Sequence, residues 1–145
     1  MANTKKAMKI IINTSMLIAV VISFIRWDGE PTFHAIAGIV FALLFAVHFW
    51  LNKKMFFAYG KNIRKLDASK KRKYLIDVLL IIVWSIVIVS GIIALLIDPG
   101  NSETALNHGG LHGIFARIGG VLIVIHIFQH GRQIVSYFRK NETAK

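Results

Sequence analysis

Four histidines form two pairs with the same spacing inside apolar stretches. His34 and His48 bracket the run HAIAGIVFALLFAVH, and His112 and His126 bracket HGIFARIGGVLIVIH, so the members of each pair are fourteen residues apart. In a left-handed helix bundle the surface pattern repeats every seven residues, which returns both members of a pair to one face. At 1.5 Å per residue the two imidazoles lie about 21 Å apart along the helix. Two such helices side by side would present facing imidazoles at two levels.

Facing pairs of imidazoles indicate a metal group that needs only two protein ligands. A zinc site needs about four ligands at one point, and each level offers two. Haem supplies four equatorial nitrogens itself, so two axial imidazoles complete its iron. A single histidine in a membrane could equally be a hydrogen-bonded packing residue, but two pairs with one spacing favour ligation. The chain contains no cysteine, which excludes thiolate-bound clusters and covalent haem attachment. The pattern therefore predicts two non-covalent b haems bound by bis-histidine ligation.

Membrane-spanning helices are the elements that must hold these histidines. Of the 145 residues 55% are hydrophobic, and the mean hydropathy of +0.59 is too high for an ordinary soluble domain. The apolar runs are close to the roughly 20 residues that cross a bilayer, and a backbone in lipid must bond to itself. We expect helices over residues 10–25, 33–52, 74–97 and 111–136, in one domain that spans residues 1–145. The predicted fold class is all-α, an integral membrane four-helix bundle.

The net charge of +11 comes from basic residues whose distribution along the chain indicates the membrane topology. Basic residues gather before the first predicted helix, between the second and third, and after the fourth. The positive-inside rule therefore places both termini and the central loop in the cytoplasm. We expect this charge to orient the protein and to attract anionic membrane lipid, not to bind nucleic acid. On this topology His34 pairs with His112 at an outer level, and His48 pairs with His126 at an inner level.

Two arginines are expected to serve the outer haem. Arg117 lies about 7.5 Å below His112 along its helix. A lone arginine in lipid needs a counter-charge, and a haem propionate is the natural one. Arg26 could serve the same haem from the first outer loop. At the inner level the candidates for this role are Asn52, Lys53, His130 and Arg132.

Small residues offer surfaces against which a flat ring or a second helix can pack. Gly38 follows His34 by one turn, and Gly119 lies seven residues from both His112 and His126. Phe41 has the corresponding position in the second predicted helix, and we expect its ring to lie opposite Gly119 between the two levels. Ser90-Gly91 in the third predicted helix likewise allows the close approach of a neighbouring helix or of a cofactor edge.

The remaining polar residues lie in the two helices without paired histidines and in the second outer loop. Asp77 in the third predicted helix is interpreted as an interfacial ion pair with nearby basic residues, in preference to a proton carrier. His108 in the second outer loop is expected to be solvated. The hydroxyl and amide groups of the first predicted helix either bond to an imidazole N–H or bond back to their own helix; they belong to Asn13, Thr14, Ser15 and Ser23.

The two halves of the chain also resemble each other. Aligning His34 with His112, and His48 with His126, gives one offset of 78 residues, which pairs HFWLNKK with HIFQHGR. This alignment gives the first and third predicted helices equivalent roles. An internal duplication is a plausible origin of the pattern.

The segments AVHFWLNKKMFFAYGK and LHGIFARIGGVLIVIHIFQHGR, within four short helices, resemble the flavinylation-associated cytochrome family. These are small bacterial membrane domains encoded near flavin-carrying extracytosolic electron-transfer proteins. The resemblance implies a b-type cytochrome in the bacterial cytoplasmic membrane. Such a protein would move electrons between quinone or a cytoplasmic donor and an outer acceptor, so a quinone or a flavoprotein is the implied redox partner.

Other functions stay open at this stage. Some relatives of that family are associated with haem tolerance, which makes haem sequestration an alternative. Small di-haem superoxide oxidases share the architecture, so superoxide:quinone oxidoreductase activity is another. Six-coordinate iron has no open position for a substrate, which favours electron transfer over chemistry at the metal. A multidrug-type transporter fits less well, because the first, second and fourth predicted helices contain no embedded carboxylate.

Overall fold

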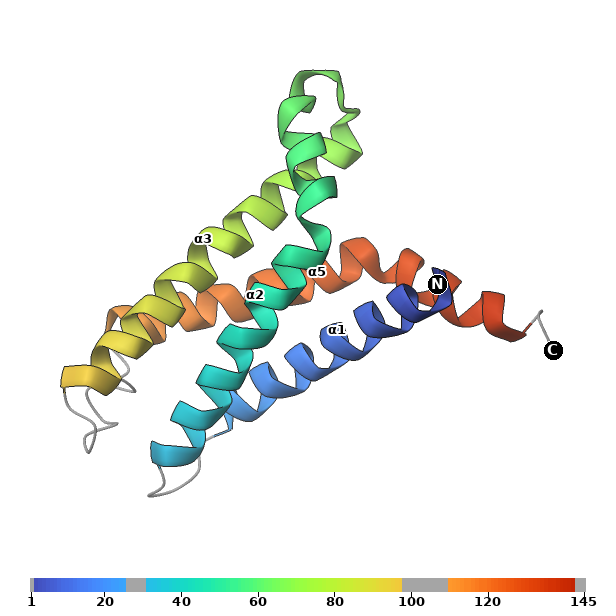
Figure 1. The fold of residues 1–145 in the computed structure, drawn as a ribbon. Coiled ribbons are helices and arrows are strands. Elements are labelled where there is room, and N and C mark those ends of the chain that lie inside the picture. Colours follow the sequence, from blue (N-terminus) through green and yellow to red (C-terminus); the bar gives the residue numbers. More distant parts are fainter. Residues whose placement is uncertain (1, 26–30, 98–109, 143–145) are drawn as a thin grey trace.

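The computed structural model describes residues 2–25, 31–97 and 110–142, with side chains over 7–25, 32–97 and 110–131. Within these ranges the chain forms four long helices, α1 (Ala2–Phe24), α2 (Pro31–Lys61), α3 (Ala68–Ile97) and α5 (Leu111–Glu142). A short 3₁₀ turn, η1 (Ile63–Lys65), lies between α2 and α3 (Figure 1). The predicted all-helical class with four long helices is confirmed.

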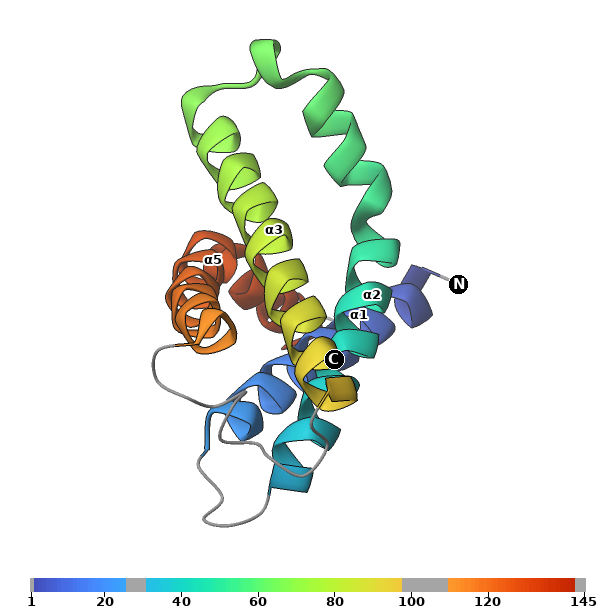
Figure 2. The same ribbon diagram turned by 90° about the vertical axis from the view of Figure 1, so that its left-hand side faces the viewer.

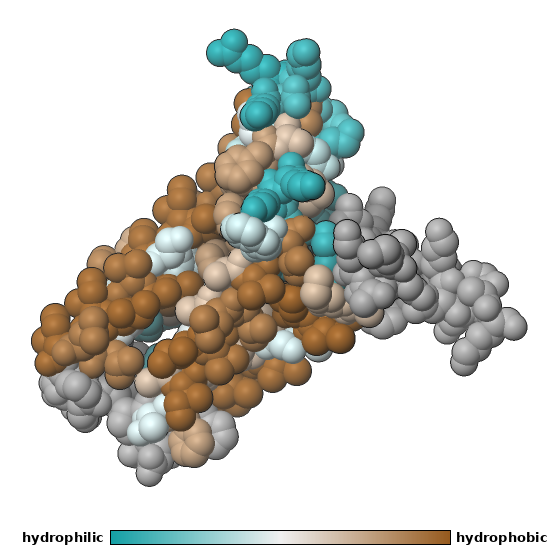
Figure 3. All heavy atoms as spheres, viewed as in Figure 1, coloured by the Kyte–Doolittle hydropathy of each residue, from teal (hydrophilic) through white to brown (hydrophobic). Residues whose placement is uncertain are grey.

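Each of these helices is long and apolar enough to cross a bilayer. The spans suited to this are Ala7–Phe24, Thr32–Lys61, Ala68–Ile97 and Leu111–Gly131. Large apolar side chains point outward along them, among them Phe128, which is 81% exposed, and Ile97, which is 79% exposed. Figure 3 shows this apolar surface as a continuous brown area over the helices. Because soluble proteins rarely expose so much apolar surface, the four helices suggest a multi-pass membrane protein.

The helices pack as two antiparallel pairs. α1 packs along α2 and α3 packs along α5, and a smaller contact between α2 and α3 joins the two pairs. Figure 2 shows α1 beside α2 and α5 beside α3. The two helices that carry the paired histidines, α2 and α5, are not one of these closely packed pairs in the described part of the chain.

Residues 53–73, assigned to a loop from the sequence, are largely helical. α2 continues to Lys61 and α3 begins at Ala68, so the two helices form a hairpin that projects beyond α1 and α5 (Figure 1). The hairpin is the most hydrophilic part of the face in Figure 3. Lysine, arginine and alanine are good helix formers, so the helix continues where the apolar pattern ends. The apolar pattern therefore underestimates the length of both helices.

Asp67 begins α3 as its N-cap. Its carboxylate accepts the N–H of Lys70 at 2.8 Å and pairs with the Lys70 ammonium at 2.9 Å. These contacts with Lys70 hold the pKa of the Asp67 carboxyl below its usual value. Asp67 is exposed, and it lies ten residues before Asp77 on the same helix.

A small core lies midway between the two histidine levels. The ring that packs on Gly119 is that of Trp84, because a Cβ on Gly119 would lie 3.0 Å from Trp84 Cε2. Phe41, expected from the sequence to lie opposite Gly119, packs on Trp84, with ring centroids 4.5 Å apart. An aromatic pair therefore fills the space between the levels. The buried residues of this core are Ala19, Val20, Phe41, Leu80, Val83, Trp84, Val87 and Leu122.

The contact between Gly119 and Trp84 predicts that Gly119→Leu destabilises the protein. Three atoms of the buried Trp84 ring lie 3.0–3.2 Å from the added Cβ, and overpacking of this kind costs about 1–3 kcal/mol. The measurement is thermal unfolding in detergent, followed by circular dichroism. Gly131→Leu is the matched control, because no described side chain lies within 4 Å of a Cβ at Gly131. Equal unfolding temperatures of the two variants would contradict the prediction.

Candidate functional site

The structure brings the two outer-level histidines together. His34 lies in the first turns of α2, and His112 lies in the first turn of α5. Their ring centroids are 6.0 Å apart and their planes are nearly perpendicular, at 83°. Both side chains are half-buried. The outer pairing predicted from the spacing and the topology therefore corresponds to a ring contact between two helices.

Each outer ring is anchored through Nδ1 to a backbone carbonyl of the neighbouring helix. His34 Nδ1 lies 3.0 Å from the carbonyl oxygen of Ser23 on α1. His112 Nδ1 lies 3.0 Å from that of Val87 on α3, and 3.1 Å from the hydroxyl of Ser90. A carbonyl oxygen can only accept, so Nδ1 carries the proton and donates it in both rings. Nε2 is then the unprotonated nitrogen of each neutral ring.

Gly91 makes room for the His112 ring. A Cβ at this position would lie 3.0 Å from His112 Cε1 and 3.4 Å from Nδ1. The close approach that the sequence suggested for Ser90-Gly91 is therefore made by an imidazole. Any larger residue would push the ring away from the carbonyl of Val87.

The inner-level rings are anchored in the same way, but to side chains. His48 Nδ1 bonds to Asn13 Oδ1 on α1 at 2.8 Å. His126 Nδ1 bonds to Asp77 Oδ1 on α3 at 2.9 Å. The amide oxygen and the carboxylate are acceptors, so these rings also donate from Nδ1. Of the two interpretations of the first helix, Asn13 bonds to an imidazole, whereas the Ser23 hydroxyl bonds back to Ala19 O at 2.8 Å.

The four acceptors are regularly spaced. Asn13 and Ser23 are ten residues apart on α1, and Asp77 and Val87 are ten residues apart on α3. At 1.5 Å per residue this corresponds to about 15 Å along each helix. The helices without paired histidines thus supply one acceptor at each level.

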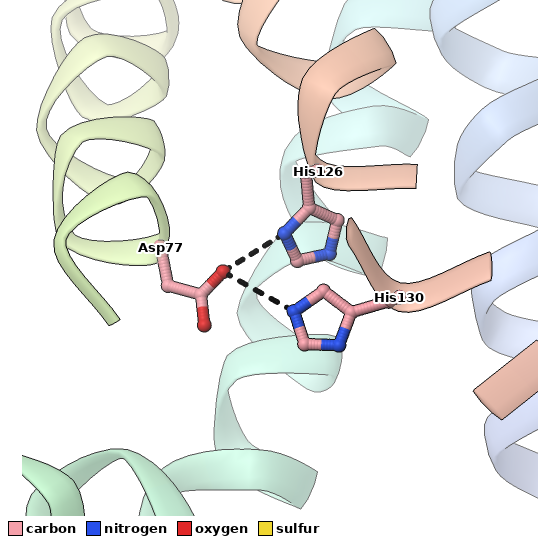
Figure 4. A group of neighbouring side chains, drawn as sticks. All are labelled: Asp77, His126 and His130. Carbon is pink, nitrogen blue, oxygen red and sulfur yellow. Dashed lines mark hydrogen bonds and ion pairs between the residues drawn. The ribbon is translucent and has the colours of Figure 1, made fainter. Parts of the chain in front are cut away.

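Asp77, His126 and His130 form a compact group at the inner level. Figure 4 shows their side chains converging from α3 and α5. Asp77 Oδ1 lies 2.9 Å from His126 Nδ1 and 3.8 Å from His130 Nε2, and the two rings are in contact, with centroids 4.6 Å apart and planes tilted by 39°. One nitrogen or oxygen of each residue lies within 4.8 Å of the others, a group that could hold a metal ion. Asp77 was expected to pair with lysine or arginine; the partners in the structure are imidazoles.

The inner level is a cluster of four residues. His48 lies within electrostatic range of His126, Asp77 and His130. The ring in contact with that of His126 is nevertheless His130, one turn further along α5. A ring contact between His48 and His126 is not among those made by the described side chains. The structure therefore brings the predicted inner ligands into one neighbourhood without placing their rings in contact.

Of the remaining residues predicted to contact the haems, the structure describes the surroundings of Gly38 and the exposure of Arg117. A Cβ at Gly38 would meet no side chain within 4 Å among those that the structure describes. Arg117 is exposed on α5. Arg26 and His108 lie outside the described residues, and the side chain of Arg132 is also outside them.

Two inner-level candidates for contacts with a propionate have protein partners. Asn52 accepts a hydrogen bond from Lys9 at 3.0 Å and donates one to His48 O at 2.8 Å. The Lys53 ammonium lies 3.0 Å from the centre of the Trp50 ring. The ammonium groups of Lys9 and Lys53 therefore lie near the inner end of the bundle, and neither of these contacts involves Asp77.

An apolar groove of about 440 Å³ lies between α1 and α5. Its described lining consists of apolar side chains and one glycine, so it offers no side-chain donor to a quinone ring. The residues that line it are Leu17, Val20, Val21, Phe24, Ile25, Gly120, Ile123, Val124 and Ile127.

No family model, curated protein or solved structure matches this chain. What the site can do therefore follows from its residues. It offers four half-buried imidazoles at two levels, each with Nδ1 bonded and Nε2 open to a metal, and a carboxylate at the inner level. Ligating histidines in proteins almost always show this arrangement, in which the second nitrogen donates to an oxygen.

The anchoring bonds predict the tautomer of all four histidines. In haem-free protein, His34, His48, His112 and His126 should carry the proton on Nδ1, because each Nδ1 donates to an oxygen. Long-range ¹H–¹⁵N spectra of ¹⁵N-histidine-labelled protein in detergent distinguish the two tautomers. Asn13→Ala should change the signals of His48 alone, and Thr14→Ala is the neighbouring control. Rings protonated on Nε2 in the wild type would contradict the prediction.

Proposed function

We propose that this chain is a membrane b-type cytochrome that binds two haems by bis-histidine ligation and carries electrons across the bilayer. The observation that carries the proposal is the common anchoring of four histidine rings through Nδ1. This anchoring fixes the tautomer and the orientation of each ring, raises the basicity of Nε2, and leaves that nitrogen for an axial bond. A packing histidine also needs an acceptor for its ring N–H, so the support comes from the use of the same nitrogen by all four rings at two levels.

The geometry of the outer level fits a metal between two imidazoles. Imidazole nitrogens bind metals at about 2.0–2.1 Å, and a ring centroid lies about 1.1 Å behind its nitrogen, so two rings on opposite sides of one metal have centroids about 6.2–6.4 Å apart. The centroids of His34 and His112 are 6.0 Å apart. Two ligands suffice only if the group brings its own equatorial donors, as haem does.

The packing of the helices also favours a flat group between α2 and α5. These helices carry the ligands, but each packs mainly on a helix without paired histidines. Among the described residues, no atom outside the local helix backbone lies within 4 Å of a Cβ built at Gly38, one turn after His34. At the inner level His48 and His126 are the corresponding ligands, with Asn13 and Asp77 behind them.

The residues of the chain define how the site would work. Haem iron, when bound, supplies one-electron redox chemistry. Two imidazoles at each level would hold the haem iron and would leave it no open position for a substrate. Trp84 and Phe41 fill the space between the levels and keep water out of it. We assign the basic α2–α3 hairpin and both termini to the cytoplasm, with quinone or a cytoplasmic carrier as donor and an extracytosolic flavoprotein as acceptor.

The proposal predicts about two haems per chain, each of which is lost when a histidine of its own level is replaced. His34→Ala or His112→Ala should remove the outer haem, and His48→Ala or His126→Ala the inner haem, because one remaining axial ligand holds the group weakly. The measurement is pyridine haemochrome quantitation of purified protein with reduced-minus-oxidised spectra. His108→Ala is the matched control and should keep both haems. A wild-type protein that takes up no haem, even on reconstitution, would refute the proposal.

A second candidate function is the binding of a divalent metal by Asp77, His126 and His130. The observation that favours it is the convergence of a carboxylate and two imidazoles within 4.8 Å. Two histidines and a carboxylate form a ligand set for zinc or iron(II), with open positions left for water. This function requires Asp77 and His130 as ligands, whereas haem ligation by His126 requires neither of them to touch the iron.

Zinc binding to haem-free protein tests this second function. The wild type should bind about one Zn²⁺ per chain in equilibrium dialysis, and His130→Ala should bind none, because two remaining ligands are too few. The same variant should still bind two haems if His130 is not an axial ligand. His108→Ala controls for the loss of a histidine. Unchanged zinc binding by His130→Ala would exclude the metal site.

A further inference from the structure

The four anchoring hydrogen bonds differ in the charge of the acceptor. At the outer level both acceptors are backbone carbonyl oxygens, those of Ser23 and Val87. At the inner level one acceptor is the amide oxygen of Asn13 and the other is the carboxylate of Asp77. Among these four acceptors only Asp77 carries a full negative charge. The two levels are therefore electrostatically unequal although their ligands are identical.

We propose that Asp77 is a positioning residue that gives the inner haem a lower reduction potential than the outer haem. This inference rests on the two-haem function proposed above and adds the direction of electron flow. A carboxylate that accepts the ring N–H of a ligating histidine raises the basicity of that ligand. A more basic ligand stabilises iron(III), which has one more positive charge than iron(II), so the reduction potential falls.

The potential difference gives electron transfer a direction. If both levels hold haem, Asp77 would favour the transfer of one electron from the inner level to the outer level. No proton enters or leaves in this step. Electrons would therefore pass from the side of the basic α2–α3 hairpin to the opposite side.

Other charges at the inner level weaken this effect without reversing it. Lys9 is exposed and bonds to Asn52, so solvent and salt screen its charge. His130 is a competing partner for the same Asp77 oxygen, but at 3.8 Å it is more distant than His126 at 2.9 Å. The Asp77 side chain is only 21% exposed, so its own charge is screened far less than that of Lys9.

The test is a redox titration of the haem-loaded full chain and of its Asp77→Asn variant, followed by absorbance. Asparagine keeps the size of the side chain and its acceptor oxygen but removes the charge. Loss of an outer-shell partner changes metal affinity about 10–100-fold, and a tenfold change in the preference for iron(III) over iron(II) corresponds to about 59 mV. One midpoint should rise by about this amount and the other should stay. His112→Ala, which retains only the inner haem, assigns the shifted midpoint.

Asp67→Asn is the matched control, because it removes the same charge from the same helix at an exposed position. It should leave both midpoints unchanged. Asn13→Asp is the reciprocal variant. It places a carboxylate behind His48 and should lower the inner midpoint. If Asp77→Asn fails to hold the inner haem, a lowered midpoint in Asn13→Asp supports the inference and an unchanged one overturns it.

The outcomes separate the two proposals. Two bound haems with unmoved midpoints in Asp77→Asn and Asn13→Asp would overturn the role of Asp77 and leave the cytochrome function intact. An equal shift in Asp67→Asn would also overturn it, since the effect would then be one of net charge. A wild type without haem would instead overturn the function on which the inference rests.

Discussion

The hydrogen bond from a histidine Nδ1 to an oxygen on the neighbouring helix is the interaction on which the structure depends. In a hydrocarbon environment an unpaired ring N–H is costly, so each ring must find an acceptor. His34 and His48 find theirs on α1, and His112 and His126 find theirs on α3. The same four bonds link the helices within each pair and aim Nε2 away from the partner helix.

These bonds make the two halves of the chain structural counterparts, but with two offsets. The histidines of α2 recur on α5 after 78 residues, whereas the acceptors of α1 recur on α3 after 64. The fourteen-residue difference lies between the outer acceptor and the outer histidine of each pair, which are eleven residues apart in the first half and twenty-five in the second. Part of it is helix, because α3 continues ten residues beyond Val87 and α1 only one residue beyond Ser23. An alignment on the histidines alone therefore misplaces the first helix against the third. What repeats between the two halves is the arrangement of one histidine and one acceptor at each level, and not a single alignment of the residues.

The sequence was sufficient for the features that depend on local pattern. Apolar runs marked the four helices, and a fourteen-residue spacing marked the histidine faces. It was insufficient for the acceptors, because their identity depends on the register between helices. Ser23 and Val87 accept through backbone carbonyls, which every residue has, so no side chain could signal them. Asp77 did have a signal, but its neighbours in sequence are basic and its neighbours in space are imidazoles.

The limited contact between α2 and α5 explains why the supporting helices determine ligand geometry. α2 and α5 are held mainly by α1 and α3, and the contact of α2 with α3 connects the two pairs. Trp84 on α3 stands at this junction, between Gly119 of α5 and Phe41 of α2. The distance between α2 and α5 therefore depends on the packed rings of Trp84 and Phe41. A change at α3 would be transmitted to both histidine levels, although α3 itself supplies none of the four axial ligands proposed.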